Sequence, residues 1–128
     1  MVDIGCNDGV LLKGYPQGRF RLLGVEPSSV GKYAEEAGFE VLAAFFNEDT
    51  GLRILESHGG ADIVTATNVF AHVDDIRSFA KGIEALLADD GVVIIEFPYL
   101  RDMIEQLYFD TIYHEHLSYF ALTPLARY

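Results

Sequence analysis

Two histidines, two tyrosines, an aspartate and a glutamate lie within eleven residues near the end of the chain, in the stretch DTIYHEHLSYF (residues 110–120). Such side chains can bind a metal, transfer protons or form a polar turn over a core. His114 and His116 are two apart, which in a strand would place both on one face. The stretch lacks the helical H-E-x-x-H spacing and any nearby cysteine, so we predict no metal site. An acid–base site and a structural turn both remain open on these residues alone.

A second group of residues forms a glycine-containing turn between the first expected strand and helix. Gly5 permits a tight turn, Asn7 tolerates left-handed backbone geometry, and Gly9 lets the helix pack against the sheet. The N–H groups at the start of that helix favour an anion. Glu26 follows the second expected strand, where a carboxylate can accept hydrogen bonds from both hydroxyls of a ribose. The turn and the glutamate together predict a nucleotide-type cofactor site; the alternative is a plain turn with a surface glutamate.

The elements between these groups must place them at one edge of a sheet. Apolar runs and turn residues predict strands over residues 2–4, 21–25, 39–45, 63–69 and 92–97, with helices in most of the intervals and a turn at residues 89–91. Strands that alternate with helices pair in parallel. The expected fold is therefore α/β, a doubly wound, Rossmann-like open sheet with its ligand at the carboxyl ends of the strands. The stretch 110–120 follows the fifth strand and should reach that edge.

Composition limits the classes of protein. The chain has 128 residues, half of them apolar, which suits a single domain. Twenty acidic and nine basic residues give a formal charge of -11, which disfavours nucleic acid polymers and anionic membranes as partners. The single cysteine, Cys6, cannot form an internal disulfide and is expected to be a small buried residue of the turn. With no signal-peptide pattern and no bilayer-length apolar run, we expect a cytoplasmic protein.

The glycine spacing separates two kinds of cofactor. A dinucleotide fingerprint requires G-x-G-x-x-G, whereas this turn reads D-x-G-x-N-x-G from Asp3 to Gly9. Spacing of this kind, with an acid two residues before the first glycine, resembles the turn of S-adenosylmethionine-dependent methyltransferases. The resemblance implies that Asp3 and the turn backbone lie near the methionine part of the cofactor.

A narrower resemblance covers essentially the whole chain. The motifs GCNDG, GVEPS, ATNVFAHVDD, EFPYL and DTIYHEHLSYF, in this order, resemble those of the bacterial sugar C-methyltransferases of deoxysugar and antibiotic-sugar pathways. The family carries a zinc-binding N-terminal domain, a central methyltransferase domain and a C-terminal lobe, and residues 1–128 match only the central domain. We therefore expect a truncated class I methyltransferase fold, inactive when isolated, that dimerises through an exposed sheet edge.

The same resemblance implies a reaction and roles for individual residues. The family methylates carbon 3 of a nucleotide-linked 4-keto-6-deoxy sugar: a base removes the proton next to the ketone, and the enolate attacks the methyl group. His116 is predicted to be the base. His72 is expected to donate to the enolate oxygen or to contact the sugar. The other residues expected at the sugar are Tyr113, His114, Glu115, Glu96 and Tyr99; those expected at the cofactor, beyond Asp3 and the turn, are Glu26, Phe46 and Asn68.

Two other classes of protein remain as alternatives on the sequence. One is a nucleotide-dependent oxidoreductase or epimerase on the same kind of sheet, and the other is a non-catalytic module that keeps the fold. Individual residues also have plain structural interpretations, because His72 suits a helix cap and Phe45 and Phe46 suit the core.

Overall fold

Five parallel strands form one sheet in the computed structural model, which describes residues 1–16 and 18–126. The sheet order is β3-β2-β1-β4-β5, and all four neighbouring pairs are parallel. This confirms the predicted α/β fold. The order reverses between β1 and β4, so the carboxyl ends of these two strands flank the ligand position expected for such a sheet. The strands are β1 (Val2–Ile4), β2 (Leu23–Val25), β3 (Glu40–Leu42), β4 (Ala61–Thr67) and β5 (Leu87–Glu96).

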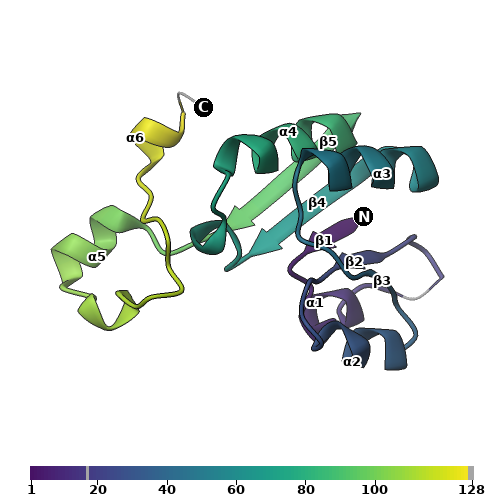
Figure 1. Ribbon diagram of the computed structural model, residues 1–128, viewed down its shortest axis with the longest axis horizontal. Coiled ribbons are helices and arrows are strands. Elements are labelled where there is room, and N and C mark those ends of the chain that lie inside the picture. The colour runs from purple at the N-terminus through teal and green to yellow at the C-terminus, as the bar shows by residue number, and fades with distance from the viewer. Residues whose placement is uncertain (17, 127–128) are drawn as a thin grey trace.

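Helices cover both faces of the sheet (Figure 1). On one face lie α1 (Val10–Lys13) and α2 (Gly31–Glu36), and on the other lie α3 (Glu48–His58) and α4 (Ile76–Leu86). A short 3-10 helix, η1 (Phe70–His72), follows β4. The chain after β5 forms α5 (Leu100–Gln106), η2 (Phe109–Thr111) and α6 (Leu122–Leu125), which stand away from the sheet at one end. None of the helices in the described residues has the length and apolar character needed to cross a membrane.

The main core lies between the sheet and the α3–α4 face. Phe79, Ile83 and Leu86 are buried in it, as the three- and four-residue spacing on α4 predicts. The carboxylate of Asp75 accepts the N–H of Ser78 at 3.0 Å and caps α4. The cap fixes where α4 begins, at the carboxyl edge of the sheet.

The helices α3 and α4 cross at two glycines. A Cβ atom on Gly82 would collide with the backbone of Asn47, and one on Gly51 would collide with the backbone of Gly82. Asn47 is itself the cap of α3, because its side chain accepts the N–H of Thr50 at 2.9 Å. The close crossing therefore brings the starts of both helices together at the same edge.

The strand β5 begins earlier than the sequence predicts. Residues 89–91, expected as a turn, lie inside it. Pairing with β4 shifts at this point, because Ala61 pairs with Leu87 whereas Ile63 pairs with Val92. The turn-forming residues are accommodated as an irregularity in an edge strand, where extra residues need not pair on the outer side.

Aromatic rings join the C-terminal segment to the end of the sheet. The ring of Phe120 lies 4.5 Å from that of Phe70 and 5.5 Å from that of Phe97. The N–H of Leu117 donates to the carbonyl of Ala71 at 2.8 Å. The chain thus leaves the sheet after β5 and returns to η1, bringing residues 110–120 back beside the end of β4.

Candidate active site

A cavity of about 970 Å³ lies at the carboxyl edge of the sheet. Its walls come from the turn after β1, the ends of β2 and β4, the segment before α3, η1 and the start of α4. In the described residues no Lys or Arg side chain lines it, while four acidic residues do. The cavity therefore favours a ligand that carries positive charge. Seven residues predicted from the sequence line it: Asp3, Gly5, Asn7, Glu26, Phe46, Asn68 and His72.

Two backbone N–H groups hold the carboxylate of Glu26 in place. The Oε2 of Glu26 accepts the N–H of Asn7 in the glycine turn at 3.1 Å, and the Oε1 of Glu26 accepts the N–H of Ser28 at 2.9 Å. Each carboxylate oxygen keeps acceptor capacity for a ribose hydroxyl. Gly5 has a φ of 70°, and a Cβ atom there would collide with the side chain of Val69, so this position requires glycine.

Three N–H groups of this turn donate within the protein. That of Asn7 is bonded as just described, that of Gly9 donates to the carbonyl of Cys6 at 2.8 Å, and that of Val10 donates to the carboxylate of Asp8 at 3.2 Å. The N–H groups of Leu11 and Leu12, at the start of α1, are not among these bonded groups, so the expectation of an anion there stays a prediction. Gly9 packs against α2 and does not line the cavity.

Asp3 is a buried carboxylate in the wall of the cavity. It is 3% exposed, and the hydroxyl of Thr65, its register partner on β4, donates to its Oδ1 at 2.6 Å. Burial raises the pKa of Asp3, and the hydrogen bond from Thr65 acts in the opposite direction. A cation in the cavity would stabilise the ionised carboxylate.

Cys6 is a buried thiol in the same turn. Burial, followed by the charges of Asp3 and Glu26, raises the pKa of Cys6 to about 11. The thiol is therefore protonated at neutral pH and is a poor nucleophile. This agrees with the prediction of a small structural residue.

The adjacent residues Phe45 and Phe46 differ in how far they are buried, although both line the cavity. Phe46 is 9% exposed and packs edge-on against Phe79 at 5.3 Å, so it belongs to the core as well as to the cavity wall. Phe45 is 79% exposed and also lines the cavity. From the sequence we expected only Phe46 at the cofactor. The exposed apolar residues Val10 and Leu11 also line the cavity and were not predicted there. Apolar residues directly after the turn were the signal for this apolar rim.

A group of aromatic and imidazole rings adjoins the cavity at η1. The Nδ1 of His72 lies 2.6 Å from the carbonyl oxygen of Glu115, and its ring lies 4.9 Å from that of His116. The hydroxyl of Tyr113 lies 2.8 Å from the Nε2 of His116. Because His72 also lines the cavity, it connects the cavity to residues 110–120.

Two backbone carbonyls determine the tautomers of these imidazoles. The carbonyl of Thr111 lies 2.9 Å from the Nδ1 of His116, as that of Glu115 faces the Nδ1 of His72. A carbonyl can only accept, so Nδ1 carries the proton in both rings. In the neutral form, the Nε2 of His116 accepts from Tyr113 and the Nε2 of His72 keeps a lone pair. A neutral His72 can therefore accept from a ligand through Nε2 but cannot donate to it.

His114 does not join this group. Residues 113–116 form a turn in which the N–H of His116 donates to the carbonyl of Tyr113 at 3.1 Å, and the side chain of His114 is exposed. The two histidines therefore do not share a strand face. Across the part of the chain that the structure describes, no group of three or more His, Cys, Asp or Glu is arranged to hold a metal ion.

Three other predicted residues contribute through the backbone. Glu96 ends β5 with an exposed side chain, and its carbonyl accepts the N–H of Asn68 at 2.9 Å. Tyr99 forms a bridge with Phe120 and precedes α5. Glu115 contacts His72 through its carbonyl. Their expected side-chain contacts with a sugar remain predictions.

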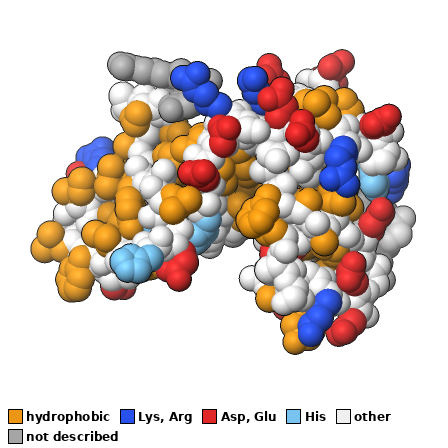
Figure 2. Space-filling view, in the orientation of Figure 1, with side chains coloured by type: hydrophobic (Ala, Val, Ile, Leu, Met, Phe, Trp, Pro, Cys, Tyr) orange, Lys and Arg blue, Asp and Glu red, His pale blue; other side chains and the backbone are white. Residues whose placement is uncertain are grey.

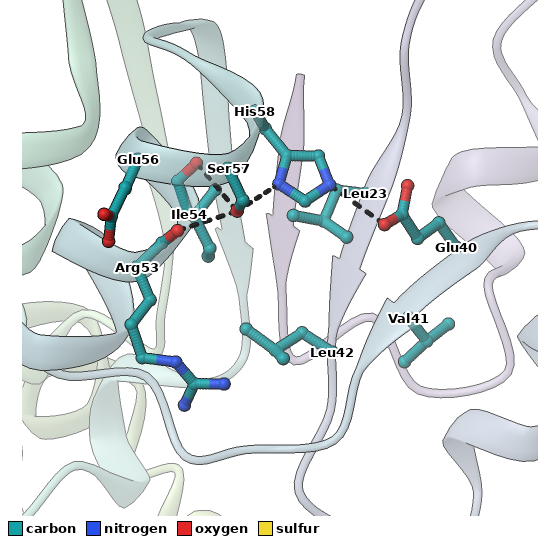
Figure 3. Close-up of a pocket in the computed structure, with 9 residues that line it drawn as sticks. All are labelled: Leu23, Glu40, Val41, Leu42, Arg53, Ile54, Glu56, Ser57 and His58. Carbon is teal, nitrogen blue, oxygen red and sulfur yellow. Dashed lines mark hydrogen bonds and ion pairs between the residues drawn. The ribbon is translucent and has the colours of Figure 1, made fainter.

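A second hollow, of about 300 Å³, lies at the amino edge of the sheet (Figure 3). Here His58 lies between Ser57 (Oγ to Nδ1, 2.7 Å) and Glu40 (Oε1 to Nε2, 2.9 Å). The carboxylate of Glu40 can only accept, so the Nε2 of His58 donates to it. The single proton of the Ser57 hydroxyl can be shared between the Nδ1 of His58 and the carbonyl of Arg53, which is 2.7 Å away. These contacts join the end of α3 to β3.

The entire chain, residues 1–128, matches the family described as Methyltransferase domain. It belongs to this family and is an S-adenosylmethionine-dependent methyltransferase domain. It is 39% identical over 126 residues to C-methyltransferase NovU from Streptomyces niveus, covering 98% of this chain and 30% of NovU. It is also 25% identical over 96 residues to a ubiquinone biosynthesis O-methyltransferase from Rhodopseudomonas palustris strain BisA53, covering 74% of this chain and 38% of that protein. The chain thus spans well under half the length of these relatives.

Solved structures agree on the fold. The plantazolicin methyltransferase BpumL in complex with S-adenosylhomocysteine superposes with a TM-score of 0.69 at 16% identity, over 98% of this chain and 52% of that one. Its complex with a pentazolic desmethylPZN analog and the same product gives 0.71 at the same identity and coverage. The class I methyltransferase fold is therefore confirmed, and dinucleotide enzymes are no longer an alternative.

The cofactor is S-adenosylmethionine, and the residues present fit it. Its sulfonium and ammonium groups match a cavity that is lined by acids. When bound, it supplies a methyl group on positively charged sulfur.

Proposed function

We propose that the whole protein methylates carbon 3 of a nucleotide-linked 4-keto-6-deoxy sugar, with His116 as the base. The observation that carries this proposal is the contact of His72 with both the cofactor cavity and residues 110–120. This contact supports a position for a proton-accepting imidazole beside the cavity. Similarity to C-methyltransferase NovU favours carbon as the acceptor.

Methyl transfer to carbon needs a proton acceptor, because a sugar carbon is not a nucleophile. The base takes the proton from carbon 3, and the electron pair of that C–H bond forms the enolate with the 4-keto oxygen. Carbon 3 then attacks the methyl group, and the pair of the broken C–S bond returns to sulfur. A positioned base contributes about 10²–10⁴-fold to such a reaction.

Tyr113 complements His116 in this proposal. Its hydroxyl occupies the Nε2 lone pair that would receive the proton. When the sugar binds, the hydroxyl turns to the 4-keto oxygen, where it stabilises the enolate, and Nε2 faces the proton on carbon 3. His72 accepts from a sugar hydroxyl, and the nearby sugar contacts are His114, Glu115, Glu96 and Tyr99.

The cofactor lies across the cavity in the proposed complex. Glu26 binds the ribose hydroxyls, and Asp3 and the turn lie at the methionine end. Phe45 and Phe46 border the adenine, and Asn68 closes the site at the end of β4. The presence of these residues in the cavity lining supports the proposed placements.

The test is methyl transfer by the whole protein to nucleotide-linked 4-keto-6-deoxy sugars, followed by mass spectrometry and NMR. His116→Gln should reduce turnover about 10²–10⁴-fold, whereas His58→Gln, at the amino edge of the sheet and outside the cavity lining, should retain most of it. Turnover by His116→Gln equal to that of the unchanged protein would rule out His116 as the base.

A further inference from the structure

The cavity wall contains a buried pair of residues that belongs to neither the glycine turn nor the histidine group. Asp3 and Thr65 face each other across β1 and β4, and they are 3% and 4% exposed. The hydroxyl of Thr65 lies 2.6 Å from the Oδ1 of Asp3. This is a short hydrogen bond, as expected when the acceptor is ionised.

We infer that Thr65 is a positioning residue for cofactor binding: its hydroxyl holds Asp3 as an oriented carboxylate that attracts the ammonium group of the cofactor's amino-acid part. The inference rests on the proposed position of Asp3 at the methionine end of the cavity. Thr65 itself is not among the residues that line the cavity, so it acts through Asp3.

The geometry leaves one carboxylate oxygen for the ligand. Oδ1 is bonded to Thr65, and no buried side-chain oxygen in the described residues lacks a partner, so Oδ2 is not sealed in the protein. Asp3 lines the cavity, which places its free oxygen toward the ligand space. With Oδ1 held by Thr65, the carboxylate of Asp3 has one orientation and offers Oδ2 to a ligand.

The surroundings make this hydrogen bond important for the charge. Burial disfavours the ionised form of Asp3. The nearby groups that can carry charge are Cys6, Asp8 and Glu26 on the turn side, and His72, Asp74 and Asp75 elsewhere in the cavity wall. In the described residues, no Lys or Arg lines the cavity to help. The hydrogen bond from the Thr65 hydroxyl therefore favours the ionised form of Asp3 before the cofactor binds.

The test compares Thr65→Val, Thr65→Ser and the unchanged whole protein. Titration of the Asp3 carboxyl carbon by NMR, without ligand, should show a higher pKa in Thr65→Val and a value close to the original in Thr65→Ser. By calorimetry, Thr65→Val should bind S-adenosylhomocysteine about tenfold more weakly near neutral pH. The loss should shrink as pH rises, because Asp3 then ionises in both proteins.

Two controls separate this role from simple destabilisation. 5′-Methylthioadenosine lacks the amino-acid part of the cofactor, so its affinity should be nearly the same in all three proteins. Thr50→Val removes another buried hydroxyl, which donates to the carbonyl of Phe45 at 2.8 Å, and it should lower stability without moving the titration of Asp3.

The inference is overturned if the Asp3 titration in Thr65→Val matches that of the unchanged protein. It is equally overturned if both ligands lose affinity by the same factor at every pH. These measurements involve no sugar, so they stand apart from the proposed reaction: failure to methylate a keto sugar would leave them unaffected.

Discussion

Among single residues, Asp3 has two opposite effects: its charge favours cofactor binding, and its burial lowers the stability of the ligand-free domain. Burial raises the pKa of Asp3, so the folded chain holds this proton to higher pH than the unfolded chain does. The contribution of Asp3 to stability is therefore lost as pH rises from the unfolded pKa through the folded pKa. A neutral side chain at this position avoids that loss.

Asp3→Asn should accordingly raise the Tm of the ligand-free domain at about pH 8, with a gain that shrinks toward the ordinary aspartate pKa of about 4. The same variant should bind S-adenosylhomocysteine more weakly, because the charge is gone. Thermal melts at both pH values and calorimetry measure the two effects. A Tm at pH 8 that is equal to or lower than that of the unchanged protein would contradict the stability argument.

Glu26 is the second residue with a measurable role. Glu26→Gln replaces one carboxylate oxygen by an amide nitrogen, which can no longer accept both a backbone N–H and a ribose hydroxyl. We expect affinity for S-adenosylhomocysteine to fall about tenfold or more by calorimetry. Glu35→Gln, exposed on α2 and outside the cavity lining, is the matched control and should bind normally.

At the scale of the elements, the α3–α4 crossing supports one wall of the cavity. Gly82→Ala would push the backbone of α4 against Asn47, the cap of α3 and part of the wall. We expect a loss of about 1–3 kcal/mol of unfolding free energy in denaturant melts, typical of overpacking. Glu84→Ala, exposed on the same helix, should change stability by less than about 0.5 kcal/mol. Equal effects of the two changes would show that the crossing tolerates a methyl group.

Local sequence patterns could predict the elements that carry the cavity. The glycine turn, Glu26 and the apolar stripe of α4 each follow from spacing within one segment, and the structure has all three. The roles of Phe45 and Phe46 could not be predicted, because they depend on how the segment before α3 meets Phe79. The imidazole tautomers likewise depend on carbonyls that only the folded chain brings near, and the bond of the Asn7 N–H depends on the position of Glu26.

For the molecule as a whole, the described surface has exposed apolar side chains at the β5 edge and around α5 and η2. The strand β5 is at the edge of the sheet, and Val92 and Ile94 are more than half exposed on it. Figure 2 shows further apolar side chains gathered over the part of the molecule that contains α5 and η2, where Leu107 and Phe109 are 75% and 78% exposed. Exposed edges and apolar patches of this kind favour association.

We therefore predict that the 128-residue domain self-associates through the β5 edge. Light scattering after size-exclusion chromatography should show a dimer or larger species whose fraction rises with concentration. Ile94→Lys, which places a charge on that edge strand, should shift the domain toward monomer, whereas Leu55→Lys, at an exposed position on α3, should not. A clean monomer across the concentration range would contradict the prediction.

The relatives include both C- and O-methyltransferases. The proposed function of the whole molecule therefore depends on which atom of the substrate accepts the methyl group. The most direct measurement uses the whole protein and a nucleotide-linked 4-keto-6-deoxy sugar that carries deuterium at carbon 3, with NMR and mass spectrometry of the methylated product. We predict that every methylated molecule has lost this deuterium and carries its new methyl group on carbon 3. A methylated product that retains the deuterium and bears the methyl group on oxygen would contradict it.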